Sequence, residues 1–165
     1  MMDAVKTAPG PLGDLLQEFV TRVAHRGGRT LTVMNEASVT LQQVILLNRI
    51  RETPDGTSSE LAAALGMSLT SVSQMIDRLF RLKLVTRAEM ATDRRKKRID
   101  LTKKGHTLLA RLREARSMEF NISAAALSPK VQADLSQVLA RALAELDHRV
   151  DDLGADRAIR GRANG

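Results

Sequence analysis

The sequence predicts a mainly α-helical chain that carries one small β-hairpin near its middle. Apolar residues recur at helical spacing on both sides of a central stretch, residues 58–102. In that stretch two short helices, a tight turn and a basic hairpin follow one another without a spacer. The chain has 165 residues, of which 43% are apolar, enough to bury one core. We therefore expect one domain, or two lobes that share a core.

Composition argues against several classes of protein. The chain has no cysteine, which excludes disulfides, thiolate metal sites and thiol redox sensing. Its three histidines lack metal-ligand spacing, and no phosphate loop, nucleophile elbow or H-E-x-x-H motif occurs, so we predict no metal, no cofactor and no enzyme activity. No apolar segment approaches the roughly 18–20 residues that span a membrane. With no secretory signal in the N-terminal segment, we expect a cytoplasmic protein.

The N-terminal part is expected to be an arm followed by an apolar helix. Residues 1–11 hold two prolines and a glycine, and we predict a flexible arm there. Residues 12–23 keep a helical period of apolar side chains. Gly27-Gly28 weakens the pattern, since each glycine costs about 1 kcal/mol relative to alanine. The helix either ends near Arg26 or continues through Met34.

The next helix is expected to support the central stretch from behind. Thr40 has the character of an N-cap, and apolar residues at helical spacing follow from Leu41 to Ile50. The turn Thr53-Pro54-Asp55-Gly56 ends this helix, because proline and glycine interrupt the period.

The central stretch begins with two helices that are joined very tightly. Thr57 and Glu60 form a T-x-x-E capping box for the first helix, which stops at Gly66. Ser68 caps the second helix only three residues after Leu65. This spacing describes a helix-turn-helix, whose second helix can enter a groove of DNA.

The second helix has an apolar and a polar face. The apolar stripe, at positions i, i+3, i+4 and i+7, is expected to face the core: Val72, Met75, Ile76 and Leu79. The other face carries side chains suited to base edges: Thr70, Ser71, Ser73, Gln74 and Arg78. We predict that these five bind DNA, with Gln74 the best candidate for a bidentate contact to adenine. A solvated face is the alternative, but such faces are more usually rich in Glu and Lys.

A basic hairpin, or wing, is predicted after the helix-turn-helix. Two β-capable runs, LVTRAEM and IDL, flank the tip ATDRRKKR. From Arg81 to Lys104 there are ten Lys or Arg against three acidic residues, so this window has a net charge of +7, equal to that of the whole chain. A basic run alone is more often a solvated loop, but its place after the helix-turn-helix favours DNA contact. We predict phosphate and minor-groove contacts from four residues: Arg94, Arg95, Lys96 and Lys97.

Two long helices are expected after the wing. Thr102 is predicted to cap a helix that runs to about Ala125. Ser128 and Pro129 then start a second helix, which we expect to end at Gly154. Residues 154–165 are predicted to form a disordered tail.

We call the central stretch, residues 58–102, the reading head. The outer helices carry more apolar surface than is needed to cover a reading head of this size. We therefore predict a winged helix-turn-helix DNA-binding region, residues 36–102, plus terminal dimerisation helices, residues 12–35 and 103–153. A two-fold homodimer would space two recognition helices about one DNA turn apart, roughly 34–36 Å, for a palindromic site. An intramolecular bundle is the alternative.

The stretch LAAALGMSLTSVSQMIDRLFRLKLVTRAEMATDRRKKRIDLTKKG resembles the winged helix-turn-helix of the MarR family of bacterial transcription regulators. The match includes the D-x-R wing signature of Asp93 and Arg95, and an L-T-x-x-G motif that follows it: Leu101, Thr102 and Gly105. The resemblance extends over most of residues 12–150. Where the family commonly has a glycine before the first wing strand, this chain has Lys83.

This resemblance implies several further properties. It implies a homodimer built from both ends of the chain, and it favours a first helix that is continued or kinked through Gly27-Gly28. It implies that Asp93 orients a neighbouring wing arginine, although a purely structural turn role for Asp93 is the alternative. Members of the family often release DNA when a small, frequently anionic aromatic molecule binds between the dimer helices and the reading head. No residue of this sequence identifies such an effector.

These patterns together predict a sequence-specific transcriptional regulator, more readily a repressor than an activator. We expect it to bind a palindromic operator in double-stranded DNA as a homodimer, and a small-molecule effector could release it. The alternative is a non-specific architectural DNA-binding protein.

Overall fold

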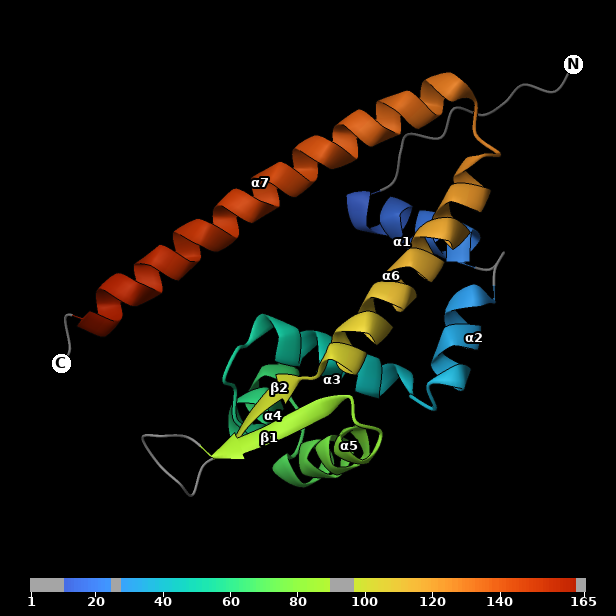
Figure 1. Ribbon diagram of the computed structural model, residues 1–165. Helices are drawn as coiled ribbons and strands as arrows, with labels where there is room; N and C mark the ends of the chain where they lie inside the picture. The colour runs from blue at the N-terminus through green and yellow to red at the C-terminus, as the bar shows by residue number, and fades with distance from the viewer. Residues whose placement is uncertain (1–10, 25–27, 90–96, 163–165) are drawn as a thin grey trace, which may run out of the picture. The chain divides into compact units, whose positions relative to one another are not determined.

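The computed structural model describes residues 11–24, 28–89 and 97–162; residues 1–10, 25–27, 90–96 and 163–165 lie outside the described residues (Figure 1). Within the described part of the chain, seven helices accompany one antiparallel pair of strands. In chain order the elements are α1 (Leu12–Ala24), α2 (Arg29–Glu36), α3 (Leu41–Glu52), α4 (Ser58–Leu65), α5 (Leu69–Arg81), β1 (Val85–Glu89), β2 (Lys97–Leu101), α6 (Lys103–Ala124) and α7 (Pro129–Arg162). The predicted mainly α class with a small β wing is confirmed.

The chain divides into two compact units. The first unit extends to Phe120 and holds α1 to α5, both strands and most of α6. The second begins at Asn121 and consists of the last residues of α6 and the helix α7. Every residue of the main hydrophobic cluster lies in the first unit. Among residues 121–146, by contrast, no side chain is buried.

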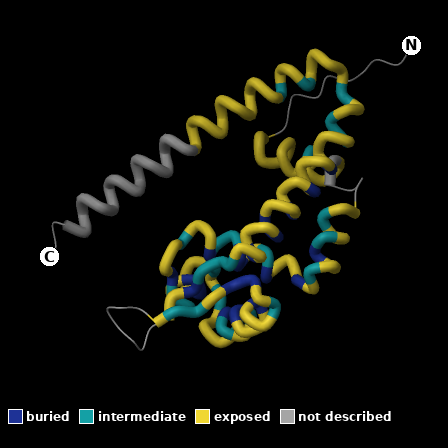
Figure 2. Tube along the Cα trace, viewed as in Figure 1, coloured by how far each residue is buried: buried dark blue, intermediate teal, exposed yellow. Residues whose placement is uncertain are grey.

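The core of the first unit forms where α3, α4, α5, the two strands and the first half of α6 meet, as the buried segments in Figure 2 show. Its most completely buried side chains are aliphatic: Leu46, Leu47, Leu61, Val72, Ile76, Leu79, Leu84, Val85 and Ile99. Burial of one such side chain stabilises the fold by about 1.5–3 kcal/mol. Helix α3 contacts α4 and β2, so it supports the helix-turn-helix as expected.

Side-chain caps fix where the helices begin. Thr40 and Thr57 each form a complete capping box with the residue three positions later. Ser68 Oγ accepts a hydrogen bond from Ser71 N, and Thr102 Oγ1 accepts one from Gly105 N. Gly66 ends α4 with a φ of 61°. These predicted helix limits are confirmed, and together they hold α4 and α5 in a tight helix-turn-helix.

The two strands form the expected antiparallel ribbon. Val85 pairs with Leu101 at its base, and Glu89 pairs with Lys97 where the described part of the hairpin ends. The turn between α3 and α4 adds to the ribbon, because Ile99 N donates to Gly56 O at 2.9 Å. The base of the wing is therefore tied to the same core that holds the helix-turn-helix.

A helix continued or kinked through Gly27-Gly28, the favoured prediction, is not supported at Gly28, which lies outside both helices; residues 25–27 are not described. Helix α1 ends at Ala24 and α2 begins at Arg29, with Gly28 as its N-cap residue. Two adjacent glycines make helix propagation unfavourable. Pro11, the last residue of the predicted arm, accepts hydrogen bonds from the first turn of α1 through its carbonyl; the rest of that arm lies outside the described residues.

The predicted helix end at Gly154 is wrong. Helix α7 continues through this glycine to Arg162, where we expected a disordered tail from residue 154. One glycine costs a helix only about 1 kcal/mol, and the segment ADRAIRGR that follows is rich in alanine and arginine, which are strong helix formers. The propensity of the following residues thus outweighs the single glycine.

Lys83 replaces the glycine that the resemblance led us to expect between α5 and β1. It has a φ of 59°, in the left-handed region that favours glycine. Lys83 N donates to Phe80 O at 2.9 Å and Leu84 N donates to Leu79 O at 3.0 Å, the pair of bonds of a Schellman motif. The chain keeps the turn geometry of glycine at this position but pays the steric cost of a Cβ.

We predict that Lys83→Gly raises the free energy of unfolding by about 1 kcal/mol, because a non-glycine residue in the left-handed region costs about 1–2 kcal/mol and glycine recovers part of this cost. Urea unfolding followed by circular dichroism measures the change. Lys83→Ala is the matched control, and it should not stabilise because alanine retains the Cβ. A less stable glycine variant would contradict this account of the turn.

Candidate nucleic-acid interface

Helix α5 is held so that one side is buried and the other is accessible. Val72, Ile76 and Leu79 are fully buried, and Met75 packs against them. This arrangement confirms the apolar stripe that the sequence predicts. Since the helix is amphipathic and anchored along that stripe, the remaining positions of α5 must face away from the core.

Two of the predicted DNA-binding residues on α5 are accessible to an external partner. Thr70 and Gln74 are exposed, and neither side chain has a hydrogen-bond partner among the described residues. They are four residues apart, so they lie one above the other on the helix surface. A hydroxyl and an amide therefore point away from the core side by side.

Two other predicted residues already have partners inside the fold. Ser71 Oγ accepts a hydrogen bond from Ser68 Oγ at 2.8 Å, within the N-terminal cap of α5. Arg78 Nη2 donates to the carbonyl oxygen of Ser38 at 3.2 Å, in the turn between α2 and α3. Sequence reasoning placed both on the reading face, but their partners come from the cap and from a distant turn.

The fifth residue, Ser73, lies beside the wing. A cleft of about 540 Å³ runs between α4, α5 and β2, lined by Thr57, Ser58, Ser59, Glu60, Leu69, Ser73 and Lys97. A smaller hollow of about 150 Å³ shares Ser58, Ser73 and Lys97 with this cleft. The fold thus brings Ser73 and Lys97, both predicted from the sequence, to one polar cleft.

The rest of the predicted wing contacts cannot be placed. Asp93, Arg94, Arg95 and Lys96 lie outside the described residues, so their roles stay predictions. Lys97, the first residue of β2, is exposed.

Several basic residues of the wing region are used within the protein. Arg98 forms ion pairs with Asp55 at 2.9 Å and with Asp100 at 3.3 Å. Arg87 pairs with Asp77 of α5. Lys104 Nζ donates to Leu82 O at 3.0 Å. Because Asp55 and Asp77 lie outside the window with a net charge of +7, their ion pairs with Arg98 and Arg87 offset part of the charge that this window offers to a partner.

The sequence did not predict that Arg87 and Arg98 each form an ion pair with a carboxylate of the same chain. Each arginine bonds to a carboxylate that is distant in sequence, 10 and 43 residues away respectively. A weak signal was present for Arg87, because Asp77 is the single acidic residue of α5 and the strand that follows this helix contains a cation.

A second candidate site lies on another side of the first unit, between α2, α3 and α6. This hollow of about 300 Å³ has mostly apolar walls, and three of its lining residues are arginines. The lining residues are Thr30, Met34, Leu41, Val44, Ile45, Asn48, Arg51, Leu109, Leu112, Arg113 and Arg116. No ion pair involves Arg51, Arg113 or Arg116 within the described residues. Apolar walls with uncompensated guanidinium groups suit a small anionic molecule.

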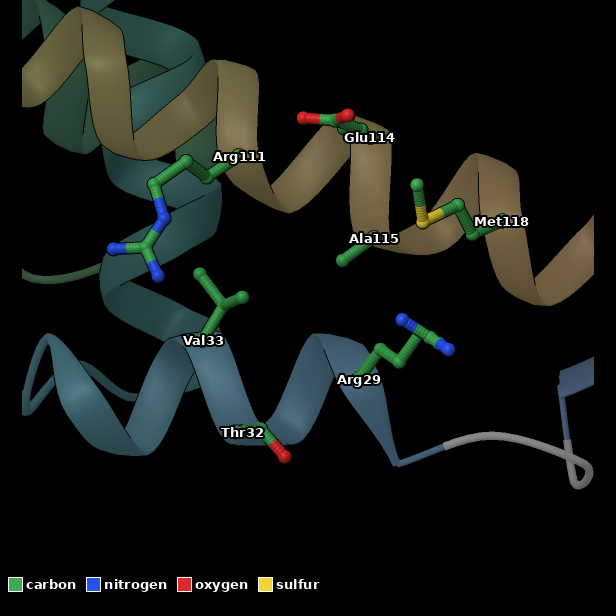
Figure 3. A pocket seen from close by; sticks show the side chains of 7 residues that line it. All are labelled: Arg29, Thr32, Val33, Arg111, Glu114, Ala115 and Met118. Carbon is green, nitrogen blue, oxygen red and sulfur yellow. The ribbon is translucent and has the colours of Figure 1, made fainter.

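A neighbouring hollow of about 280 Å³ lies between α2 and α6 (Figure 3). Figure 3 shows Val33 and Ala115 pointing into the space between the helices, with Arg29 and Arg111 at its two ends. Arg111 is already paired with Glu36 at 2.6 Å. This hollow therefore offers less positive charge to an anion than the one with three arginines.

Glu119 fixes the end of α2 that borders both hollows. Its carboxylate is buried and accepts hydrogen bonds from Thr30 N and Thr30 Oγ1, both at 2.9 Å. Helix α2 has no side-chain cap of its own at Gly28. Glu119, on α6, thus supplies from 89 residues away the negative charge that a helix N-terminus favours.

No group of three or more residues that could hold a metal ion occurs in the described ranges. None of the described helices has an apolar stretch long enough to cross a lipid bilayer.

Residues 39–105 match a family model described as a winged helix DNA-binding domain. The matched residues cover α3, the helix-turn-helix, the hairpin and the start of α6. The central part of the chain therefore has a winged helix fold and matches the model of a winged helix DNA-binding domain.

Solved structures extend the likeness beyond that domain. The transcriptional regulator Tm0710 from Thermotoga maritima is 20% identical, with a TM-score of 0.71 over 86% of this chain and 97% of that chain. Wild-type MarR from E. coli is 23% identical, with a TM-score of 0.59 over 82% and 98%. The MepR–DNA complex from S. aureus gives 22%, with a TM-score of 0.59 over 82% and 97%. The chain has the fold of these regulators, and the predicted resemblance to the MarR family is confirmed at the level of the fold.

We predict that Glu119→Ala lowers the free energy of unfolding by about 1–3 kcal/mol, since it removes a charged acceptor and leaves a helix end uncapped. Chemical denaturation measures the effect. Glu114→Ala, an exposed position on the same helix, serves as the control and should change stability by less than about 0.5 kcal/mol. Equal effects of the two substitutions would show that Glu119 does not cap α2.

Proposed function

We propose that this chain is a sequence-specific transcriptional regulator, more readily a repressor, that binds a palindromic operator as a homodimer. The observation that carries the proposal is the accessible face of α5, where Thr70 and Gln74 have no partner among the described residues. That face belongs to a winged helix DNA-binding domain and lies beside a polar cleft that contains Lys97.

In this proposal α5 enters the major groove and reads base edges. The Gln74 amide can donate to and accept from adenine in a bidentate contact, and the Thr70 hydroxyl can bond to a neighbouring base. Ser73 and Lys97, in the cleft beside α5, hold the DNA backbone at the edge of the groove. Ser71 and Arg78 each already make one hydrogen bond within the protein, so we assign them a smaller part in reading.

The predicted wing contacts complete the interface. Arg94, Arg95 and Lys96 contact phosphate, with Arg94 or Arg95 in a narrow minor groove where the negative potential is strongest. Asp93 orients one of these arginines. Support comes from the ribbon below them, which is fixed to the core through β2 and the turn between α3 and α4.

The homodimer is supported by apolar side chains that each unit leaves exposed. In α1 these are Leu12, Leu15, Leu16 and Val20. In α7 they recur at helical spacing: Val131, Val138, Leu139, Leu143 and Leu146. Contiguous exposed apolar stripes of this kind mark interaction surfaces in water. A second copy of the chain would cover them and pair two recognition helices on one palindrome.

The hollow between α2, α3 and α6 is the proposed effector site. Its apolar walls and its three arginines, Arg51, Arg113 and Arg116, suit a small aromatic anion. Helix α3 lines this hollow and also packs against α4 and β2 of the reading head. A ligand that favours one placement of α3 could therefore change the affinity for DNA.

A selection from random duplex DNA with the purified chain tests the function directly. We expect an enriched inverted repeat whose half-sites lie about 10–10.5 base pairs apart, one turn of the double helix. Retention of all duplexes with equal affinity would instead identify the alternative, a non-specific architectural DNA-binding protein.

Gln74→Ala should weaken binding to the selected operator by about 1–3 kcal/mol and change binding to random duplex much less, because it removes a base contact. Fluorescence anisotropy at fixed salt measures both affinities. Gln137→Ala, an exposed glutamine on α7, is the control and should affect neither. An equal loss on both duplexes would place Gln74 among the backbone contacts.

Benzoate, as a simple aromatic anion, should weaken operator binding by the wild-type chain, and neutral benzamide should not. The double variant Arg113→Ala and Arg116→Ala should need about tenfold more benzoate for the same release, since it lacks two guanidinium partners. Titration of the DNA complex with either compound measures the effect. Equal responses of the variant and the wild type would exclude this hollow as the effector site.

A further inference from the structure

Arg87 of β1 reaches helix α5 through two separate contacts. Its guanidinium forms an ion pair with the Asp77 carboxylate. The same guanidinium lies 5.3 Å from the centroid of the Phe80 ring. Asp77 and Phe80 are three residues apart, so one side of α5 presents both to the strand. At 28% exposed, the Arg87 side chain is the least accessible of the arginines that form ion pairs in the described residues.

We propose that Arg87 is a positioning residue, which fixes the wing against the recognition helix and does not itself contact phosphate. The inference rests on the function proposed above and assigns a role to a residue within the same interface. By sequence alone Arg87 belongs to the basic window that we assigned to DNA. Its contacts in the structure give its charge a different use.

The two contacts engage part of the guanidinium group through which an arginine binds phosphate. Nη2 of Arg87 donates to the Asp77 carboxylate, and the guanidinium carbon lies 5.3 Å from the centroid of the Phe80 ring. Phe80 is 48% exposed and is the single aromatic residue of α5, so Arg87 partly covers an apolar ring that otherwise faces water. The Arg87 guanidinium is stabilised by both the aromatic ring and the carboxylate only while it stays in this position between them.

The pair also changes the charge that α5 offers to DNA. Asp77 is the single acidic residue of this helix. An unpaired carboxylate at this position would repel the phosphate groups of a bound DNA. Pairing with Arg87 neutralises that charge within the protein. The hollow that Asp77 and Arg87 line also contains Ser73 and Lys97, so the neutralised pair borders the proposed backbone contacts.

Fixing β1 fixes the whole ribbon. Arg87 pairs with Ile99 across the ribbon, and two residues further on Glu89 pairs with Lys97. Because the strands are joined by hydrogen bonds, a contact that holds β1 on α5 also sets the distance from Lys97 to Gln74. Arg98 acts on the second strand in the same way, through its ion pair with Asp55 in the turn between α3 and α4. The wing is thus held from two sides, and among the described residues Arg87 is the one that ties it to the recognition helix by an ion pair.

The experiment compares Arg87→Ala with Lys97→Ala in the full-length chain, on the operator obtained by selection and over a series of salt concentrations. We expect Arg87→Ala to weaken operator binding about tenfold, which corresponds to the interaction energy of one coupled pair of residues. The slope of log K against log salt should stay unchanged. Lys97→Ala should reduce that slope by about 0.9, the value for one lost phosphate contact. A reduction of the slope by Arg87→Ala, or an unchanged operator affinity, would overturn the proposal.

A charge reversal provides the second arm. The double variant Asp77→Arg and Arg87→Asp restores an ion pair between the same two positions, so it should regain most of the ratio of operator to random-duplex affinity that Arg87→Asp alone loses. No recovery would overturn the proposal. Thermal unfolding of every variant checks the fold, and Arg87→Gln, which keeps the stem against Phe80, replaces the alanine variant if that variant unfolds.

These outcomes are distinct from a failure of the proposed function. If the wild-type chain binds every duplex equally, the regulator hypothesis fails before any variant is made. If the wild type is specific and Arg87→Ala behaves as Lys97→Ala does, the regulator hypothesis stands and Arg87 is a phosphate contact.

Discussion

The structure depends on the burial of one side of α5. Val72, Ile76 and Leu79 enter the core together with side chains from α3, α4 and both strands. Withdrawing this stripe would expose three fully buried side chains, at a cost of about 1.5–3 kcal/mol for each. The helix therefore cannot rotate, and the positions of Thr70 and Gln74 on the surface follow from the packing. The exposed face proposed to read DNA is in this way a consequence of the core.

Electrostatics near the wing are more local than the net charge suggests. Arg87, Arg98 and Lys104 bond to acceptors within the protein, and these bonds hold the wing ribbon on the reading head. The two ion pairs offset part of the positive charge with which this region attracts a polyanion, whereas Lys104, bonded to a neutral carbonyl, keeps its full charge. Lysine and arginine in this region thus either hold the wing in place or remain accessible to a polyanion. The internal bonds of each residue, rather than its charge, decide which of the two applies.

Local patterns in the sequence predicted most of the fold. The caps at Thr40, Thr57 and Ser68 and the apolar stripe of α5 depend on residues three or four positions apart, so the sequence alone contains the signal. The partners of Arg78 and Glu119 lie 40 and 89 residues away, and no local period announces them. The same limit applies to the site: the period of α5 predicts that Thr70 and Gln74 are exposed, whereas the internal partners of Ser71 and Arg78 could not be predicted. The DNA contacts of all these residues stay predictions.

The central claim is that the exposed face of α5 contacts DNA bases. Site-specific photo-cross-linking tests it most directly, with a photo-reactive amino acid in place of Gln74 and, in a second protein, in place of Gln137. The account predicts covalent attachment to bases of a bound duplex from position 74 and none from position 137. Cross-links from position 137 alone, with the duplex bound and position 74 unreacted, would contradict it.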